Sequence, residues 1–255
     1  MGFLTPVDRG LRARRDGVGH RHPPCGLCAD ELGAVRSDSN LPDNRHSKLL
    51  EVEAQGRQLN ILAQLVRSID PEEAENLAGK LIQEFGSLGQ VFAASSRKIS
   101  QLTGNERLAA VLSSSRAAVL EGMREEVSRL PINPRDPRLM KYLIAQMQGE
   151  EEEHLHAIFL DSQRRYIRDE RIASGDWSNV TVRMRPLFRR TIDLRSASLI
   201  LFHNHPSGKA EPSAADIDFT SKVQNVARSL GTELLDHLIV AGASVFSMRT
   251  AGLMT

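Results

Sequence analysis

Two histidines, a serine and an aspartate between residues 203 and 216 have a spacing that suits a single metal site. The short apolar run Ser198 to Phe202, closed by a Pro-Ser-Gly turn signal, is typical of a buried strand. Side chains alternate between the two faces of a strand, so His203 and His205 point the same way and Asn204 points away. Two imidazoles at the end of this strand can therefore bind one ion.

A carboxylate after the turn completes this set. Ser213 lies where a helix N-cap is expected, and Asp216 follows in the first helical turn. Two histidines and one carboxylate leave a coordination position for water, which suits hydrolysis because zinc lowers the pKa of its bound water to about 7. Taken singly, Ser213 and Asp216 read as a capping pair and the histidines as turn residues. The joint pattern favours the metal site.

The full spacing resembles the JAMM signature of the MPN/JAB metalloprotease family. Within that family, the segments HNHPSG, EPS and LLDH (residues 234–237) resemble the bacterial RadC proteins, which are often called DNA repair proteins. This resemblance extends upstream through FLDSQ at residues 159–163 and covers about the last 120 residues. A looser similarity covers residues from about 46 to 127.

The resemblance implies a zinc-dependent hydrolase that cleaves amide or isopeptide bonds in a peptide or isopeptide substrate. It implies one Zn²⁺ per chain, bound by His203, His205 and Asp216. It also implies an α/β fold of the JAB/MPN type, which is similar to cytidine deaminase: a mixed sheet flanked by helices and preceded by a small all-α domain.

The resemblance further assigns two catalytic residues. Glu170 matches the family's upstream glutamate, which holds and deprotonates the water, and Ser213 matches the serine that hydrogen-bonds the developing oxyanion. The residues alone do not distinguish Glu170 from Asp161 and Asp169 nearby. A general base must reach the water without binding the metal, and Glu170 meets this condition because it belongs to a separate element.

The chain is expected to have two folded parts after an N-terminal extension. Residues 46–130 predict a helical domain similar to the helix-hairpin-helix region of RadC proteins. Residues 131–137, with three prolines, predict a stiff linker. Residues 138–255 are expected to form the JAB/MPN domain.

Residues 1–45 are rich in Gly, Pro, Asp and Arg and predict a flexible extension. This extension contains four zinc-capable side chains within nine residues: His20, His22, Cys25 and Cys28. A structural zinc site usually pairs two separated ligand couples around a folded turn, so a disordered segment is the favoured interpretation.

Three local predictions depend on capping and patterning. Pro71, after Asp70, predicts the first position of a helix that Gly86 ends. Separate helices are expected at residues 106–112 and from there toward Val127. His154 and His156, at the start of the strand predicted for residues 155–160, are expected at a half-exposed strand edge.

A rival function is a nucleic-acid-binding module for DNA repair or recombination, with a structural or inactive metal site. Helix-hairpin-helix turns bind DNA phosphates through backbone N–H groups of a glycine-rich turn. Here Glu106 occupies the place of the second glycine and brings a negative charge, which disfavours phosphate binding. An iron oxygenase with similar ligands would need two open positions. The Pro-Ser-Gly turn breaks the pattern of an HNH nuclease.

Composition places the chain among soluble globular proteins. It has 255 residues, 40% of them hydrophobic, and a formal net charge of +1. No apolar run reaches the roughly 18 to 20 residues that span a bilayer, and no signal-peptide core is found. We therefore expect a cytoplasmic protein with no membrane partner. The sequence leaves its oligomeric state open.

Overall fold

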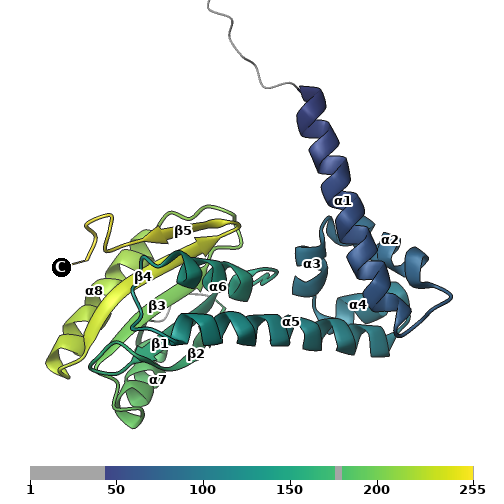
Figure 1. Cartoon of the computed structure of the whole chain (residues 1–255). Helices are drawn as coiled ribbons and strands as arrows, with labels where there is room; N and C mark the ends of the chain where they lie inside the picture. The colour runs from purple at the N-terminus through teal and green to yellow at the C-terminus, as the bar shows by residue number, and fades with distance from the viewer. Residues whose placement is uncertain (1–43, 176–179, 255) are drawn as a thin grey trace, which may run out of the picture. The chain divides into compact units, whose positions relative to one another are not determined.

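The computed structural model describes residues 44–175 and 180–254 (Figure 1). The predicted N-terminal extension, with its histidines and cysteines, lies outside the described residues. Residues 45–255 form one compact unit. None of the helices within the described ranges is both long and apolar enough to cross a membrane.

The first part of the described chain is helical, as predicted. Its helices are α1 (Asn44–Arg67), α2 (Ala74–Phe85), α3 (Leu88–Ala93), α4 (Ser96–Thr103) and α5 (Glu106–Ser128). Their inward side chains form one hydrophobic cluster, whose fully buried members include Leu62, Val66, Leu81, Val91, Ile99, Leu108 and Leu112. Gly86 ends α2 in a left-handed conformation (φ 83°), which confirms the predicted stop.

The start of α2 differs from the prediction. The helix begins at Ala74, three residues after Pro71, with Glu73 as its N-cap. Asp70 Oδ1 instead accepts a hydrogen bond from Glu73 N at 3.3 Å, so the aspartate stabilises a turn that precedes the helix.

The break expected after Leu112 was also wrong, because α5 continues as one helix to Ser128. Three serines, at 113–115, follow Leu112 without ending the helix. Ser115 Oγ donates to Val111 O at 2.8 Å, so this hydroxyl is satisfied inside the helix by the carbonyl one turn earlier.

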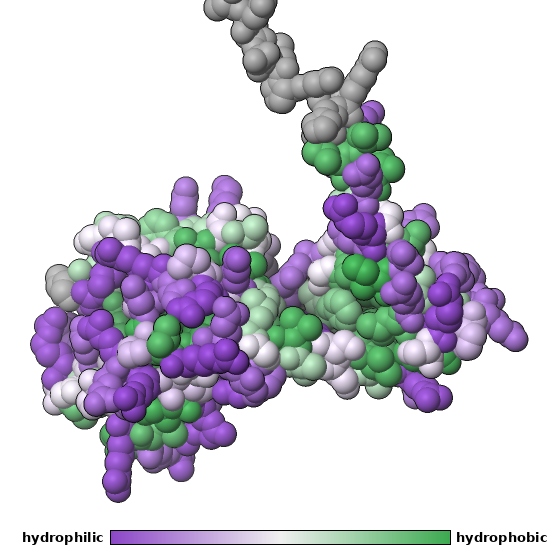
Figure 2. Space-filling model, in the orientation of Figure 1, coloured by the Kyte–Doolittle hydropathy of each residue, from purple (hydrophilic) through white to green (hydrophobic). Residues whose placement is uncertain are grey.

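Helix α1 is packed at its C-terminal end, where Leu62, Ala63 and Val66 are buried. Toward its other end, three apolar side chains are more than half exposed: Leu49, Leu50 and Val52. Hydrophobic colour is visible over this part of α1 in Figure 2. The helix therefore contributes to the core mainly through its last two turns.

The second part is a mixed five-stranded sheet with helices on both faces, which confirms the predicted α/β fold. Its elements are α6 (Pro137–Met147), β1 (His154–Leu160), β2 (Tyr166–Ser174), α7 (Val180–Asp193), β3 (Ser198–Asn204), α8 (Ala214–Ser229), β4 (Glu233–Ala241) and β5 (Ser244–Ser247). The strand order is β2-β1-β3-β4-β5. Among the strands of the described residues, only the β3–β4 pair is parallel, and α8 is the crossover that a parallel pair requires.

The central strand β3 is buried along its whole length. Leu199 and Leu201 belong to the hydrophobic cluster shared with α7 and α8, whereas Ile200 and Phe202 belong to the cluster shared with α6. Figure 1 shows α7 and α8 on one side of the sheet and α6 on the other. A strand covered on both faces explains why its sequence is a continuous apolar run.

The expected half-exposed edge at His154 was wrong. β1 lies inside the sheet between β2 and β3, and His154 is buried. Its Nε2 lies 3.0 Å from Glu150 Oε2. His156, the other histidine of the pair, is partly buried. The burial of His154 follows from strand order, which local sequence does not encode.

The proline-containing connection between α5 and α6 is fastened to the sheet. Ile132 is buried among the residues that pack with α6, and its N–H donates to Arg164 O at 2.8 Å. Arg116 of α5 donates to carbonyl oxygens of Ala93, Ala145, Gln146 and Gln148, which lie at the ends of α3 and α6. The predicted domain boundaries at residues 130 and 138 stay a prediction.

Candidate metal centre

The first histidine of the site, His203, lies near the end of the buried strand β3. His203 has no exposed surface, and the next residue, Asn204, is also buried. Asn204 Oδ1 accepts from His154 N, and its Nδ2 donates to Glu152 O, both at 2.8 Å. These bonds tie the end of β3 to the start of β1, and His205 N donates to Val240 O at 2.9 Å. The backbone that carries both histidines is therefore fixed.

The third side chain of the site comes from the first turn of α8. Ser213 is the N-cap, and its Oγ accepts from Asp216 N at 3.2 Å. Asp216 Oδ2 accepts in return from Ser213 N at 2.8 Å and from Ser213 Oγ at 2.6 Å. This capping box holds the carboxylate in one orientation, so the capping and metal-binding interpretations of the two residues are compatible.

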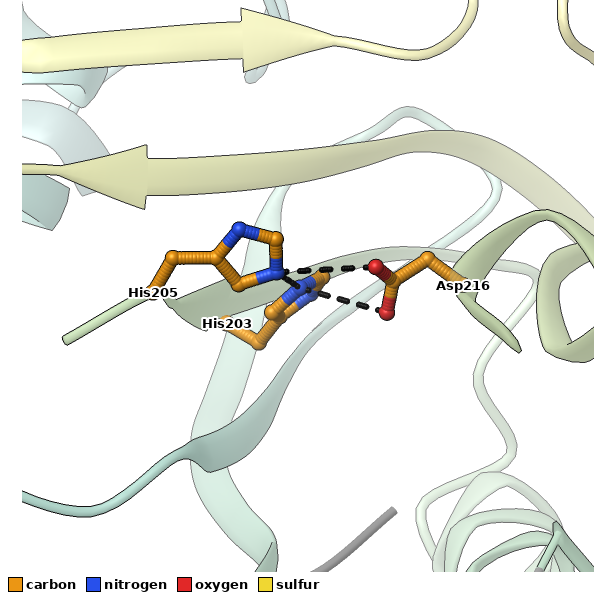
Figure 3. A group of neighbouring side chains, drawn as sticks. All are labelled: His203, His205 and Asp216. Atoms are coloured by element: carbon orange, nitrogen blue, oxygen red, sulfur yellow. Dashed lines mark hydrogen bonds and ion pairs between the residues drawn. The ribbon is translucent and has the colours of Figure 1, made fainter. Parts of the chain in front are cut away.

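The structure brings His203, His205 and Asp216 together, with the two rings and the carboxylate pointing toward one another (Figure 3). The two Nε2 atoms lie 2.9 Å apart. His203 Nε2 is 3.4 Å from Asp216 Oδ1, and His205 Nε2 is 3.5 Å from Asp216 Oδ2. Tetrahedral zinc with ligands at about 2.0 Å has ligand–ligand separations of about 3.3 Å. The three side chains therefore fit a zinc ion.

Hydrogen bonds to the Nδ1 atoms of the two histidines indicate where the imidazole protons lie. His205 Nδ1 is 2.9 Å from Lys209 O. A carbonyl only accepts, so Nδ1 carries the proton and Nε2 presents a lone pair to the cluster. His203 Nδ1 instead faces another buried histidine, with His237 Nε2 at 2.9 Å. Burial and the nearby His203 lower the pKa of His237 well below its ordinary value, so His237 is neutral at pH 7.

The contact with His237 was missed in the sequence, where LLDH served only as a family marker. A signal was present, because Asp236 and His237 interrupt the otherwise apolar run 234–240 of a buried strand. A polar pair at such positions needs a partner inside the protein. The identity of that partner depends on the pairing of β3 with β4.

Glu170 lies on β2 and is paired with Ala157 of β1, which is in turn paired with Leu201. Directly paired residues face the same side, so Glu170 and His203 are on one face of the sheet. The carboxylate accepts from Arg190 Nε at 2.6 Å and from a second Arg190 nitrogen. Hydrogen bonding by Arg190 lowers the pKa of Glu170, which is therefore ionised at neutral pH. Its role as general base stays a prediction.

The turn of the helix-hairpin-helix-like region lies between α4 and α5. Gly104 adopts a left-handed conformation (φ 67°), and Asn105 Oδ1 accepts from Leu108 N at 2.9 Å. One backbone donor at the start of α5 is thus occupied by its own cap, and the exposed Glu106 adds a negative charge there. Whether this turn binds phosphate stays a prediction.

Replacing Ser213 by alanine is expected to lower the free energy of unfolding of the metal-free protein by about 1 kcal/mol, because α8 loses its N-cap. Ser95→Ala is the matched control, since Ser95 Oγ caps α4 by accepting from Lys98 N. Urea unfolding measures both losses. Equal stability in wild type and Ser213→Ala would contradict the capping role.

Comparison with known proteins gives one family. Residues 134–253 match the RadC-like JAB domain family. A UPF0758 protein of Rhodobacter capsulatus is 34% identical over 191 residues, which are 74% of this chain and 89% of the relative. UPF0758 proteins of Bordetella petrii and Janthinobacterium are 36% and 34% identical, each over 71% of this chain and 81% of the relative.

Proposed function

Because this chain belongs to the RadC family and carries a convergent His-His-Asp cluster, we propose that it is a zinc-dependent hydrolase of amide or isopeptide bonds. The observation that carries the proposal is the approach of His203 Nε2, His205 Nε2 and the Asp216 carboxylate to within 3.5 Å of one another. Three electron-pair donors at such distances repel one another unless a cation or a proton lies between them.

The donor set supports zinc as the cation. Imidazole nitrogen and carboxylate oxygen are ordinary zinc ligands, and three protein ligands are typical of a catalytic rather than a structural site. When bound, zinc would supply Lewis acidity, which lowers the pKa of a water ligand and polarises a carbonyl oxygen. The remaining chemistry falls to side chains of this protein.

Glu170 is proposed as the general base. Its carboxylate takes a proton from the attacking water at an Oε atom and passes that proton to the leaving amine. Its ionised state at neutral pH supports this role, and so does its place on the same sheet face as His203. The Arg190 guanidinium holds the carboxylate in the observed structure, so Arg190 is proposed to orient Glu170 before it meets the water.

Ser213 is proposed to donate a hydrogen bond to the oxygen that gains negative charge. The hydroxyl lies at the edge of the cluster because it bonds Asp216 Oδ2 at 2.6 Å. An oxyanion bound beside Asp216 would compete with the Asp216 carboxylate for the hydrogen bond that the Ser213 hydroxyl donates. A single donor to a developing oxyanion contributes about 10²- to 10³-fold in rate.

The proposal is tested on the full chain, stripped with a chelator and reloaded with one equivalent of zinc. A panel of linear and isopeptide-branched peptides is offered to both forms, and cleavage is followed by mass spectrometry. We expect cleavage by the reloaded form only. Failure of the zinc-loaded protein to cleave any substrate, together with a mobility shift of DNA, would favour the rival DNA-binding module.

A further inference from the structure

A line of buried polar groups runs behind the candidate metal site. Thr220 Oγ1 lies 2.6 Å from Asp216 O and 2.6 Å from His237 Nδ1. The other ring nitrogen, His237 Nε2, lies 2.9 Å from His203 Nδ1. Thr220, His237 and His203 have no exposed surface. Each hydrogen bond in this line therefore has to be satisfied within the protein.

The direction of these hydrogen bonds follows from the group at one end. Asp216 O is a carbonyl oxygen and only accepts, so the Thr220 hydroxyl donates to it. That hydroxyl has no second proton, so its oxygen accepts from His237 Nδ1–H. A neutral His237 with its proton on Nδ1 presents an acceptor at Nε2. His203 must then donate from Nδ1.

A second neighbour of the threonine does not change this direction. Met248 Sδ lies 3.4 Å from Thr220 Oγ1. A thioether is a weak acceptor, and the Asp216 carbonyl oxygen is closer and stronger. The Thr220 hydroxyl therefore donates its hydrogen bond to the Asp216 carbonyl oxygen.

We propose that His237 and Thr220 are positioning residues that hold His203 in the tautomer with an unprotonated Nε2 directed at His205 and Asp216. The inference rests on the proposed function in that this tautomer is the one that binds a metal. Asp216 takes part at both ends, because its carboxylate belongs to the cluster while its backbone carbonyl sets the direction of the relay.

This arrangement differs from the usual support of a metal-binding histidine. Such a histidine commonly donates its second N–H to a carboxylate, a backbone carbonyl or water, as His205 does to Lys209 O. His203 instead donates to a neutral imidazole, which is an acceptor only while its own proton is held on the far nitrogen. Thr220 therefore acts on His203 through His237.

The test compares His237→Phe, His237→Gln and Thr220→Val with wild type. Phenylalanine keeps a ring in the cavity but has no acceptor, whereas the glutamine side-chain oxygen can accept from His203 Nδ1. Thr191→Val is the matched control, because Thr191 is buried and its hydroxyl donates to Leu187 O at 2.9 Å in α7, as Thr220 does in α8. Far-ultraviolet circular dichroism checks that each variant is folded.

Two readouts are used, and neither is activity. Long-range ¹H–¹⁵N NMR of the metal-free protein above pH 8 reports the His203 tautomer, and competition with a chromophoric chelator reports zinc affinity. We expect the Nδ1–H tautomer in wild type. His237→Phe and Thr220→Val should lose this preference and bind zinc about 10- to 100-fold more weakly. His237→Gln should recover most of the affinity, and Thr191→Val should match wild type.

The outcomes separate the two proposals. An Nε2–H tautomer of His203 in wild type, or unchanged tautomer and affinity in His237→Phe and Thr220→Val, would overturn the positioning role while leaving zinc binding intact. If wild type binds no zinc, the proposed function fails, but the NMR comparison still decides whether the relay sets the tautomer.

Discussion

Replacing His203 and His205 together by alanine is expected to abolish zinc binding. A complete four-ligand zinc site is worth about 10 to 16 kcal/mol, so the loss of two ligands should remove roughly half of that, more than about 1,000-fold in affinity. Metal content after dialysis is measured by plasma mass spectrometry, with Cys25 and Cys28 left intact. We expect one equivalent of zinc in wild type and none in the double variant.

The chain offers a matched control for this experiment in His154 and His156. They have the same i, i+2 spacing on β1, but no carboxylate follows them at the spacing of Asp216. The double variant His154→Gln, His156→Gln should therefore keep its zinc. Zinc retained after removal of His203 and His205 would place the metal elsewhere in the chain and overturn the site.

Glu170→Gln is expected to lower the rate of hydrolysis by about 10²- to 10⁴-fold with unchanged zinc affinity, because an amide cannot take the proton from water. Unequal effects on rate and on metal content distinguish a general base from a ligand. Asp169→Asn is the neighbouring control, since Asp169 accepts from Tyr142 Oη at 3.0 Å on the other side of the strand. A rate for Glu170→Gln equal to wild type would remove Glu170 from the mechanism.

The ionisation of Glu170 gives this prediction a pH dependence. Hydrogen bonding by Arg190 lowers the pKa of Glu170, so the carboxylate stays charged to a lower pH than an isolated glutamate would. Arg190→Met should raise the pKa toward its ordinary value, so protonation begins at a higher pH as the solution is acidified. Carboxyl ¹³C NMR across an acid titration measures this shift. Identical titration in both proteins would mean that Arg190 does not hold Glu170 in solution.

The convergence of His203, His205 and Asp216 was predictable from sequence because its signals are local. Alternation along β3 placed His203 and His205 on one side, and the capping pattern placed Asp216 in the first turn of α8. The loop between them is short, so the two elements meet at one end of the sheet. Glycine signals were equally reliable, since Gly86 has the conformation that ends a helix.

The features that escaped prediction depend on partners distant in sequence. The burial of His154 follows from the place of β1 between two strands, and the contact of His237 with His203 follows from parallel pairing of β4 with β3. The ion pair between Glu170 and Arg190 requires α7 to pack over β2. Local periodicity predicts each helix or strand separately, but it does not predict which elements lie next to one another.

The unequal exposure of the three ligands has a kinetic consequence. The side chains of His203 and Asp216 are 0% and 4% exposed, whereas that of His205 is 11% exposed. An ion would enter and leave on the His205 side, where the backbone turns through Pro206 to Gly208. The residence time of the ion would then depend on how often this loop moves, while its affinity would depend on the buried ligands. A substitution in the loop could thus speed metal exchange without weakening equilibrium binding.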